Sequence, residues 1–285
     1  TETLIIGHLP DGTPIQTLKC AVQADGIVVI NKIKSHTSFH GCYESGLLKM
    51  IVVGLGCHAG AMQYHELGFS NMANNLVEMG TIALQKLNVL FGVGIVEYAL
   101  DKLSYAEVIP KSNILKREPE LLNIVKKHAP RIPFDDLDVL VLQQIGKNIS
   151  GDGMDPNVTG RYTPAEMIPD YNHVPRISKI VVLGLSDCSN GSGIGIGNSD
   201  ATTREVFGKI DLNTTYMNAL SATVTNTCKI PIIMPNERNA IEAVIRACRL
   251  KSIAKLRMCI ASDTRNLHKM YVTEALVGHE LENCN

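Results

Sequence analysis

Hydrophobic positions along the chain follow two periodicities. Short apolar runs rich in β-branched residues predict buried strands, and we expect strands at 4–6, 27–31, 89–98, 138–145, 180–185, 256–260 and 269–272. Apolar residues that recur every three or four positions predict helices, and we expect helices at 15–24, 45–53, 57–67, 71–87, 118–128, 202–207, 212–222 and 236–250. Because strands alternate with helices, the pattern predicts an α/β fold with mainly parallel sheets.

A proline-containing stretch from Ala129 to Pro133, followed by three aspartates within five residues, divides this pattern into two parts. A chain of 285 residues is long enough for about two domains. We expect a first lobe at 1–130, a second α/β lobe at 136–274 and a tail at 275–285. Each lobe should hold a mainly parallel sheet with flanking helices.

Composition narrows the functional classes. The chain is 45% hydrophobic with a net charge of −1, no tryptophan and 5% aromatic residues. A basic surface with stacking aromatics is absent from the sequence, so we expect no nucleic-acid partner. Eight cysteines without a C-x-x-C pair are typical of free thiols in a reducing cytosol. No leader or membrane-length apolar run is visible, and we expect a soluble cytoplasmic protein without a membrane partner.

The segment 31–65 contains the most informative chemistry, because it holds four of the nine histidines and a lysine in an apolar run. Lys49 is costly to bury unless it is paired, snorkelling or used chemically. It lies four residues after Ser45, so both side chains share one face of the predicted helix. Lys49 is therefore either a nucleophilic amine or a side chain whose stem covers apolar surface.

Two other patterns carry weaker signals. His58 and His65 are two helical turns apart, roughly 10 Å along the axis, which is too far for one shared metal, and no H-E-x-x-H occurs. Taken alone, each is more commonly a surface or satisfied core residue. The glycine-alternating stretch 191–198 lacks the G-x-G-x-x-G spacing of dinucleotide sites, and we interpret it as a mobile flap.

His36, Lys49 and His65 together resemble the motif of the nickel-pincer lactate racemase family and its broader set of 2-hydroxy-acid racemases and epimerases. The matching parts are a strand at 27–31, HTSF at 36–39, Gly41, SG at 45–46, Lys49, VGLG at 53–56 and His65. The second half is similar to an uncharacterised branch of that family, through IGKNISG at 145–151, GMDPNVTGR at 153–161, KID at 209–211, YMNAL at 216–220 and TEAL at 273–276.

The resemblance implies a nickel-pincer cofactor, a pyridinium bisthiocarboxylate mononucleotide carrying nickel, in a cleft between the two lobes. Lys49 would tether it, His65 would be the protein ligand to the metal, and His36 would be the acid/base toward the substrate hydroxyl. Ser45 and Gly46 would hold the cofactor phosphate. The remaining implied residues are Asp155 and Asn157 for the cofactor, and Lys147 or Arg161 for the substrate carboxylate.

The implied reaction is racemisation or epimerisation of a 2-hydroxy acid, lactate-like or a sugar acid, by hydride transfer. The implied partners are the small-molecule substrate and cofactor-synthesis proteins, and an oligomer is compatible with this picture. We expect apo protein from a host that lacks the cofactor pathway. In the lactate enzymes a second acid/base histidine and a substrate-binding arginine lie upstream, so we expect this chain to lack that segment.

Two alternatives remain open. One is a conventional zinc or iron enzyme that uses His36, His58 and His65 without the pincer. The other is a binding or assembly subunit that retains the cavity of the family without catalysis. If no upstream segment exists, an epimerase that works on one face of its substrate, or this non-catalytic binder, is favoured over a racemase.

Overall fold

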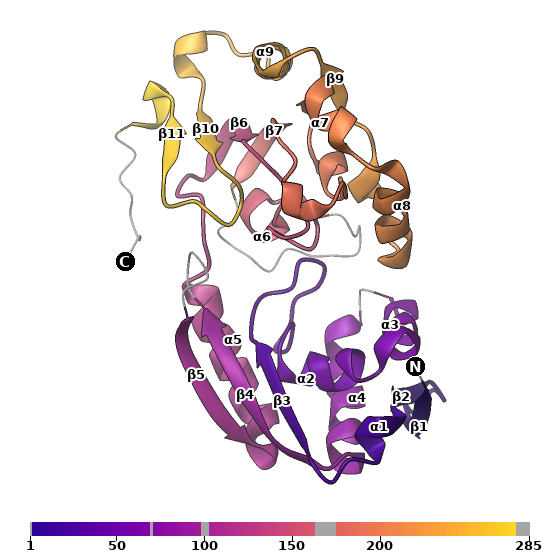
Figure 1. The fold of residues 1–285 in the computed structure, drawn as a ribbon. Coiled ribbons are helices and arrows are strands. Elements are labelled where there is room, and N and C mark those ends of the chain that lie inside the picture. Colours follow the sequence, from indigo (N-terminus) through magenta and orange to yellow (C-terminus); the bar gives the residue numbers. More distant parts are fainter. Residues whose placement is uncertain (1, 69–70, 98–102, 163–174, 278–285) are drawn as a thin grey trace. The chain divides into compact units, whose positions relative to one another are not determined.

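The computed structural model describes residues 2–68, 71–97, 103–162 and 175–277 (Figure 1). These residues form two compact units, with the division between Ala129 and Pro130. Both units combine sheets with flanking helices, so the predicted α/β class is confirmed. No helix in the described ranges has the length and apolar character needed to cross a bilayer. Tyr98 of the predicted strand 89–98, residues 163–174 of the predicted second lobe and residues 278–285 of the predicted tail lie outside the described residues.

The first unit begins with a hairpin and then builds a small sheet with helices on one face. Its elements are β1 (Thr3–His8), β2 (Pro14–Leu18), α1 (Lys19–Val22), β3 (Ile27–Lys32), α2 (Leu47–Lys49), a π-helix (Met50–Gly54), α3 (Cys57–Glu66), α4 (Met72–Lys86), β4 (Val89–Glu97), β5 (Leu103–Pro110), a 3₁₀ turn (Lys111–Asn113) and α5 (Ile114–Lys127).

The sheet of the first unit, in the order β3-β4-β5, packs closely against helices α2 and α5. A Cβ added at Gly92 of β4 would lie 2.6 Å from Leu47 of α2, and one at Gly94 would lie 3.1 Å from Leu121 of α5. Glycine therefore lets both helices approach the backbone of the central strand. This contact fixes the position of α2, whose last residue is Lys49.

Two predictions for the first unit are wrong in detail. Residues 15–18 of the predicted helix 15–24 form strand β2, because Ile15 and Thr17 alternate as buried positions opposite β1. Strand β5 was not predicted, since most of its residues are exposed and its pattern is not periodic. Because β5 runs antiparallel to β4, the parallel pairing in this sheet is limited to β3 and β4.

The second unit is a larger sheet between two layers of helices. Its elements are β6 (Asp136–Leu142), α6 (Pro156–Thr159), β7 (Arg176–Val182), 3₁₀ turns (Asp187–Ser189 and Ile196–Asn198), β8 (Ala201–Thr203), α7 (Arg204–Lys209), α8 (Leu212–Ser221), a 3₁₀ turn (Thr225–Cys228), β9 (Ile232–Met234), α9 (Glu237–Ala247), a 3₁₀ turn (Ile253–Lys255), β10 (Met258–Ala261), β11 (Met270–Val272) and a 3₁₀ turn (Glu274–Leu276).

Strand β6 lies within the sheet order β11-β10-β6-β7-β8-β9, in which only β11 is antiparallel. Both of its faces are buried: Val139 and Val141 pack in one apolar cluster with α9, whereas Leu140 and Leu142 belong to the other. This explains its continuous apolar run. The predicted mainly parallel sheet is present in this unit.

The strand order reverses at β6. The chain proceeds from β6 to β7, β8 and β9 on one side, and α9 then returns it to β10 on the other side. In open parallel sheets, ligands bind outside the carboxyl ends of the strands at such a switch point. In this unit that place lies between the segments that follow β6 and β10, which contain Lys147 and Asp263.

Two predicted features of the second unit differ from the structure. Residues 202–203 of the predicted helix 202–207 belong to strand β8, which is too short for a periodic signal, and α7 starts only at Arg204. The predicted flap at 191–198 is a packed loop, with Ser192 and Ile196 almost fully buried. A Cβ at Gly195 would lie 2.1 Å from the carbonyl oxygen of Asp152, so the glycines serve close packing.

Candidate functional site

The first unit brings His36, Lys49 and His65 together. His36 lies in the loop after β3, Lys49 ends α2, and His65 is in the last turn of α3. The Nζ atom of Lys49 lies 2.5 Å from Nε2 of His36. His65 interacts electrostatically with both of the other side chains. Residues separated by up to 29 positions thus lie in one cluster.

The hydrogen bonds of His36 place its Nε2 atom against the lysine amine. The backbone N–H of Ser38 donates to Nδ1 of His36 at 3.0 Å. Nε2 is therefore the ring nitrogen that faces Nζ of Lys49, and one of these two nitrogens accepts in the contact. The ring of Phe39 also lies near the amine, with its centroid 5.7 Å from Nζ. A lysine amine that gives up its proton in such surroundings is a nucleophile.

Electrostatics favour neutral imidazoles in this cluster. Burial holds the pKa of His36 well below its ordinary value of 6.5, and the adjacent Lys49 and His65 lower it further. The pKa of His65 is lowered by burial and then by Lys49. A neutral imidazole is the form that ligates metals and accepts protons.

Glu44 organises the loop that carries His36. Its buried carboxylate accepts hydrogen bonds from the backbone N–H of His36 at 2.7 Å and of Gly41 at 3.2 Å. Burial raises the pKa of Glu44, but contacts with His40 at 3.3 Å and with the Lys126 ammonium at 2.6 Å outweigh it and hold the pKa low. Glu44 was not predicted as a site residue, although an acidic residue within a histidine-rich loop was a signal that could have found it.

Phe39 supports His36 from the side. The two rings stack with their centroids 4.3 Å apart, and Phe39 is 3% exposed. Its other neighbour is Tyr64 of α3, at 6.5 Å between centroids. Ring contacts of Phe39 with His36 and with Tyr64 therefore connect the loop of His36 to the helix of His65.

The backbone between Lys49 and His65 is irregular. A π-helix, Met50–Gly54, follows Lys49 directly, and such segments are frequent at functional sites. Helix α3 then begins at Cys57, which has a φ of +52°. A non-glycine residue in this region stores roughly 1–3 kcal/mol of strain. These two features set the direction of the helix that carries His65.

Glu118 of α5 occupies the N-terminus of α2. Its Oε2 atom accepts from the backbone N–H of Leu48 at 2.9 Å, and a Cβ at Gly46 would lie 2.1 Å from its Oε1 atom. The backbone N–H and C=O of Ser45 are bonded to Lys34. A phosphate placed here would have to displace the carboxylate of Glu118. The role of Ser45 and Gly46 in binding the cofactor phosphate stays a prediction.

Lys147 lies in the second unit, in the segment that follows β6 at the carboxyl edge of the sheet. Its Nζ atom donates to Oδ1 of Asn218 at 2.5 Å, and the amide of Asn218 donates to Oγ of Ser192 at 2.9 Å. The backbone N–H of Lys147 donates to Oγ of Ser189 at 3.2 Å. Ser189 of the packed loop therefore holds the backbone of Lys147, and Asn218 of α8, itself bonded to Ser192 of that loop, holds its ammonium.

Arg161 lies at the opposite edge of the same sheet. Its Nη2 atom donates to the carbonyl oxygens of Ile177 and Ser178, at the start of β7, and to Asp200, just before β8. A seven-residue strand separates the two edges by roughly 20 Å. Lys147 and Arg161 therefore cannot bind the same carboxylate, because a 2-hydroxy acid cannot span this distance, and the two residues stay alternative candidates.

Asp155 and Asn157 have local structural contacts in the second unit. Oδ1 of Asp155 accepts from the backbone N–H of Asn157 and caps α6, and the Asp155 backbone N–H donates to Oγ1 of Thr264. Oδ1 of Asn157 accepts from the hydroxyl of Tyr162 at 3.1 Å. Their predicted role toward a cofactor stays a prediction.

A conventional metal site receives no support from the geometry. Within the described part of the chain, no three side chains of His, Cys, Asp or Glu converge as a metal ion requires. His58 is exposed on α3. The alternative that uses His36, His58 and His65 as a metal triad therefore lacks its geometry among these residues.

Comparisons with known proteins are sparse. No protein-family model matches the chain, and no curated protein matches it. Among solved structures, the chain is similar to the lactate racemase apoprotein from Thermoanaerobacterium thermosaccharolyticum, with a TM-score of 0.49 and 13% sequence identity. The alignment covers 93% of this chain and 67% of the racemase chain. A likeness at this level establishes neither a shared family nor a shared activity.

Proposed function

We propose that the chain is an isomerase, a racemase or epimerase of 2-hydroxy acids that works with a nickel-pincer nucleotide tethered to Lys49. The observation that carries the proposal is the 2.5 Å contact between Nζ of Lys49 and Nε2 of His36. It holds the amine against an imidazole, in the same cluster as His65. These three residues are also the ones that match the motif of the nickel-pincer lactate racemase family.

The amine of Lys49 and the imidazole of His65 fit the covalent tether and the nickel ligand that a nickel-pincer nucleotide needs. A neutral amine can be acylated by a carboxyl-derived group, which forms the covalent tether. A neutral, partly exposed imidazole at His65 suits nickel as a single protein ligand. The N-terminus of α2 does not fit the phosphate, because Glu118 already occupies it.

When bound, the nickel-pincer nucleotide supplies a centre that accepts and returns hydride. The chain's own part begins with His36, whose Nε2 atom takes and returns the proton of the substrate hydroxyl. In the untethered protein this atom is engaged with Lys49. Acylation turns the amine of Lys49 into an uncharged amide and so removes the positive charge that lowers the pKa of His36. Tethering therefore makes His36 a stronger base.

In this proposal the second unit supplies the cation for the substrate carboxylate. Lys147, held by Asn218 and Ser189, is our candidate for the cation that binds the substrate carboxylate. Its position at the carboxyl edge of a parallel sheet is the usual place for a ligand in this fold class. Arg161, at the opposite edge, is the alternative candidate.

The proposal is tested by intact-mass spectrometry of protein co-expressed with cofactor-making enzymes. We expect a mass increase in the wild type that Lys49→Ala abolishes. Lys19→Ala is the matched control, because Lys19 is an exposed lysine of the same unit, paired with Glu2, and it should keep the increase. An unmodified Lys49 in the wild type under these conditions would contradict the proposal.

A second measurement separates the enzyme from a non-catalytic binder. Protein that carries the adduct should interconvert the two configurations of a lactate-like or sugar acid, followed by chiral chromatography. His36→Ala should keep the mass increase and lose at least about a hundredfold in turnover, as expected for a general acid/base. An adduct without turnover of any acid tested would favour the binding subunit.

A further inference from the structure

The amino edge of the sheet in the second unit contains a cavity of about 570 Å³. It lies at the starts of β6 and β7, on the edge opposite to Lys147, and is therefore separate from the site proposed above. Its lining comes from the starts of β6 and β7, from Arg257 just before β10, and from the end of α6. The charged residues among them are Asp136, Arg161, Arg176 and Arg257.

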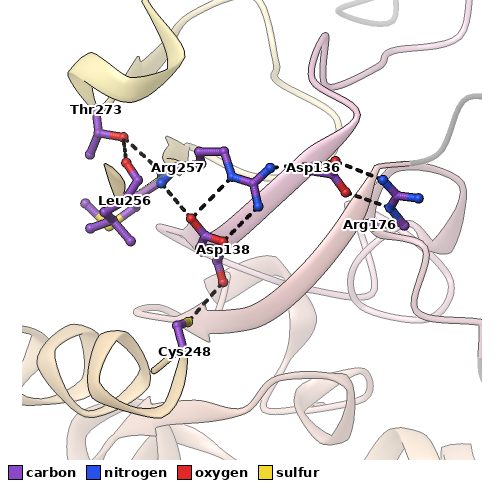
Figure 2. Close-up of polar contacts among 8 residues, drawn as sticks. Asp136, Asp138, Arg176, Cys248, Leu256, Arg257 and Thr273 are labelled. Carbon is purple, nitrogen blue, oxygen red and sulfur yellow. Dashed lines mark hydrogen bonds and ion pairs between the residues drawn. The ribbon is translucent and has the colours of Figure 1, made fainter. Parts of the chain in front are cut away.

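The charged side chains of this lining are mostly cationic. Three are arginines and one is a carboxylate, Asp136. Figure 2 shows that Asp136 is shared between Arg176, at 2.6 and 2.9 Å, and Arg257, at 3.6 Å. The main partner of Arg257 is Asp138, which does not line the cavity. Arg161 is paired with Asp200, which also pairs with Lys179. The four cations and three carboxylates of this network leave one net positive charge.

Arg161 has a donor that the protein does not satisfy. Its Nη2 atom is bonded to Ile177, Ser178 and Asp200, but its Nε atom is buried and has no hydrogen-bond acceptor among the described residues. Leaving a buried donor unpaired is unfavourable. Arg161 also lines a second cavity of about 330 Å³, together with Ser199, Asn198 and Asn226. The guanidinium of Arg161 thus borders both cavities, and its Nε–H has no acceptor among the described residues.

We propose that the larger cavity binds the phosphate group of a phosphorylated small molecule. The planar donor forks of arginine match phosphate oxygens in pairs, and the negative charge of a phosphate offsets the net positive charge of the network. The volume lies in the range of small-molecule pockets and exceeds what a bare ion needs. Arg161, Arg176 and Arg257 are the residues that bind it, and the proposal does not depend on the racemase assignment.

The test is a titration of the full chain with glycerol 3-phosphate at low salt, followed by NMR of the arginine Nε–Hε signals. Malonate serves as a dianion of different geometry. The first variant is Arg176→Met, because Arg176 is 82% exposed and its loss should not prevent folding. The second variant is Arg161→Met. Arg238→Met is the control, since Arg238 is an exposed arginine of α9, paired with Glu242.

We expect saturable binding of glycerol 3-phosphate that shifts the signals of Arg161, Arg176 and Arg257. Each of the two cavity variants should weaken it by about fivefold or more, as the loss of a charge-assisted hydrogen bond implies, and the control should bind like the wild type. If Arg161→Met does not fold, Arg176→Met decides. Absence of saturable binding, equal binding of malonate, or equal binding by the Arg176→Met variant would overturn the proposal.

Discussion

Glu118 shows how a single buried side chain can hold a site element in place. It is 1% exposed and receives the backbone N–H of Leu48, so its carboxylate occupies the positive end of α2. Burial nevertheless raises the pKa of the carboxyl to about 7, against hydrogen bonds from Leu48 and Leu47 that lower it. Its protonation near neutral pH therefore affects the element that carries Lys49.

This raised pKa predicts a pH dependence of stability that Glu118→Gln removes. In the unfolded chain the carboxyl loses its proton near 4.5, whereas in the folded protein it does so near 7. Between these values the unfolded state binds fewer protons, so wild-type stability falls as the pH rises through this window. Glutamine keeps the acceptor for Leu48 and does not titrate.

The free energy of unfolding in urea at pH 5 and pH 8 measures this effect. The Glu118→Gln variant should gain up to roughly 3 kcal/mol relative to the wild type between the two pH values. Glu120→Gln is the control, because Glu120 is an exposed glutamate of the same helix. A difference between variant and wild type that does not change with pH would show that Glu118 ionises in its ordinary range.

At the residue scale, Lys49 is conspicuous in the sequence because it lies in an apolar run, whereas His36 and His65 were chosen through the resemblance of the motif. Glu44 and Glu118 could not be assigned a role from the sequence. Glu118 meets Leu48 across 70 positions, and only the folded chain brings them together. A carboxylate on an amphipathic helix looks the same in sequence whether it faces solvent or caps another helix.

At the scale of elements, the loop at 189–198 depends on glycines that the structure uses for close packing. Gly153 has a φ of +80°, and a Cβ there would lie 1.8 Å from the carbonyl oxygen of Ile194. The same loop supplies Ser189 and Ser192, which hold Lys147 and Asn218. Packing at Gly153 is therefore coupled to the position of Lys147.

Gly153→Ala should destabilise the second unit by roughly 3 kcal/mol or more, because it combines backbone strain with a clash against main-chain atoms. Gly151→Ala is the matched control two residues away, where an added Cβ meets nothing within 4 Å, and it should change stability by less than about 1 kcal/mol. Urea midpoints measure both variants. Equal midpoints for the two variants would show that the loop yields to the added methyl group.

Sequence periodicity located most helices and the buried strands, but it failed at short or exposed elements. Strand β8 has three residues, and β5 exposes most of its side chains, so neither has a periodic apolar pattern. Strand β2 was taken as part of a helix because its alternation covers only five residues. Whether such short or exposed segments form strands depends on pairing with a neighbouring strand, which can lie far away in the sequence.

At the scale of the whole molecule, the described residues have no shared core. One apolar cluster is built from residues 9–122, and two others come from residues 132–276. Each unit therefore buries its own apolar surface. This is the property that allows a domain to fold alone.

Residues 130–285 expressed alone should therefore fold. We expect a cooperative thermal transition by circular dichroism and dispersed NMR signals, with the Arg176 and Arg257 ion pairs to Asp136 and Asp138 retained. A fragment with the same residues and Gly153→Ala should unfold at a lower temperature than the fragment itself. A fragment without a cooperative transition would show that the second unit requires the first.

The sequence by itself determined the α/β class, because periodicity is a local property of the chain, and the resemblance of its motif singled out His36, Lys49 and His65. Only the tertiary structure shows that these three side chains lie together. Only the tertiary structure decided that Arg161 and Lys147 lie at opposite edges of one sheet, although 14 positions separate them in the sequence. It also decided that Glu118 caps α2. The physical reason is that strand direction and helix packing convert separation along the chain into positions in space, and no single residue carries that information.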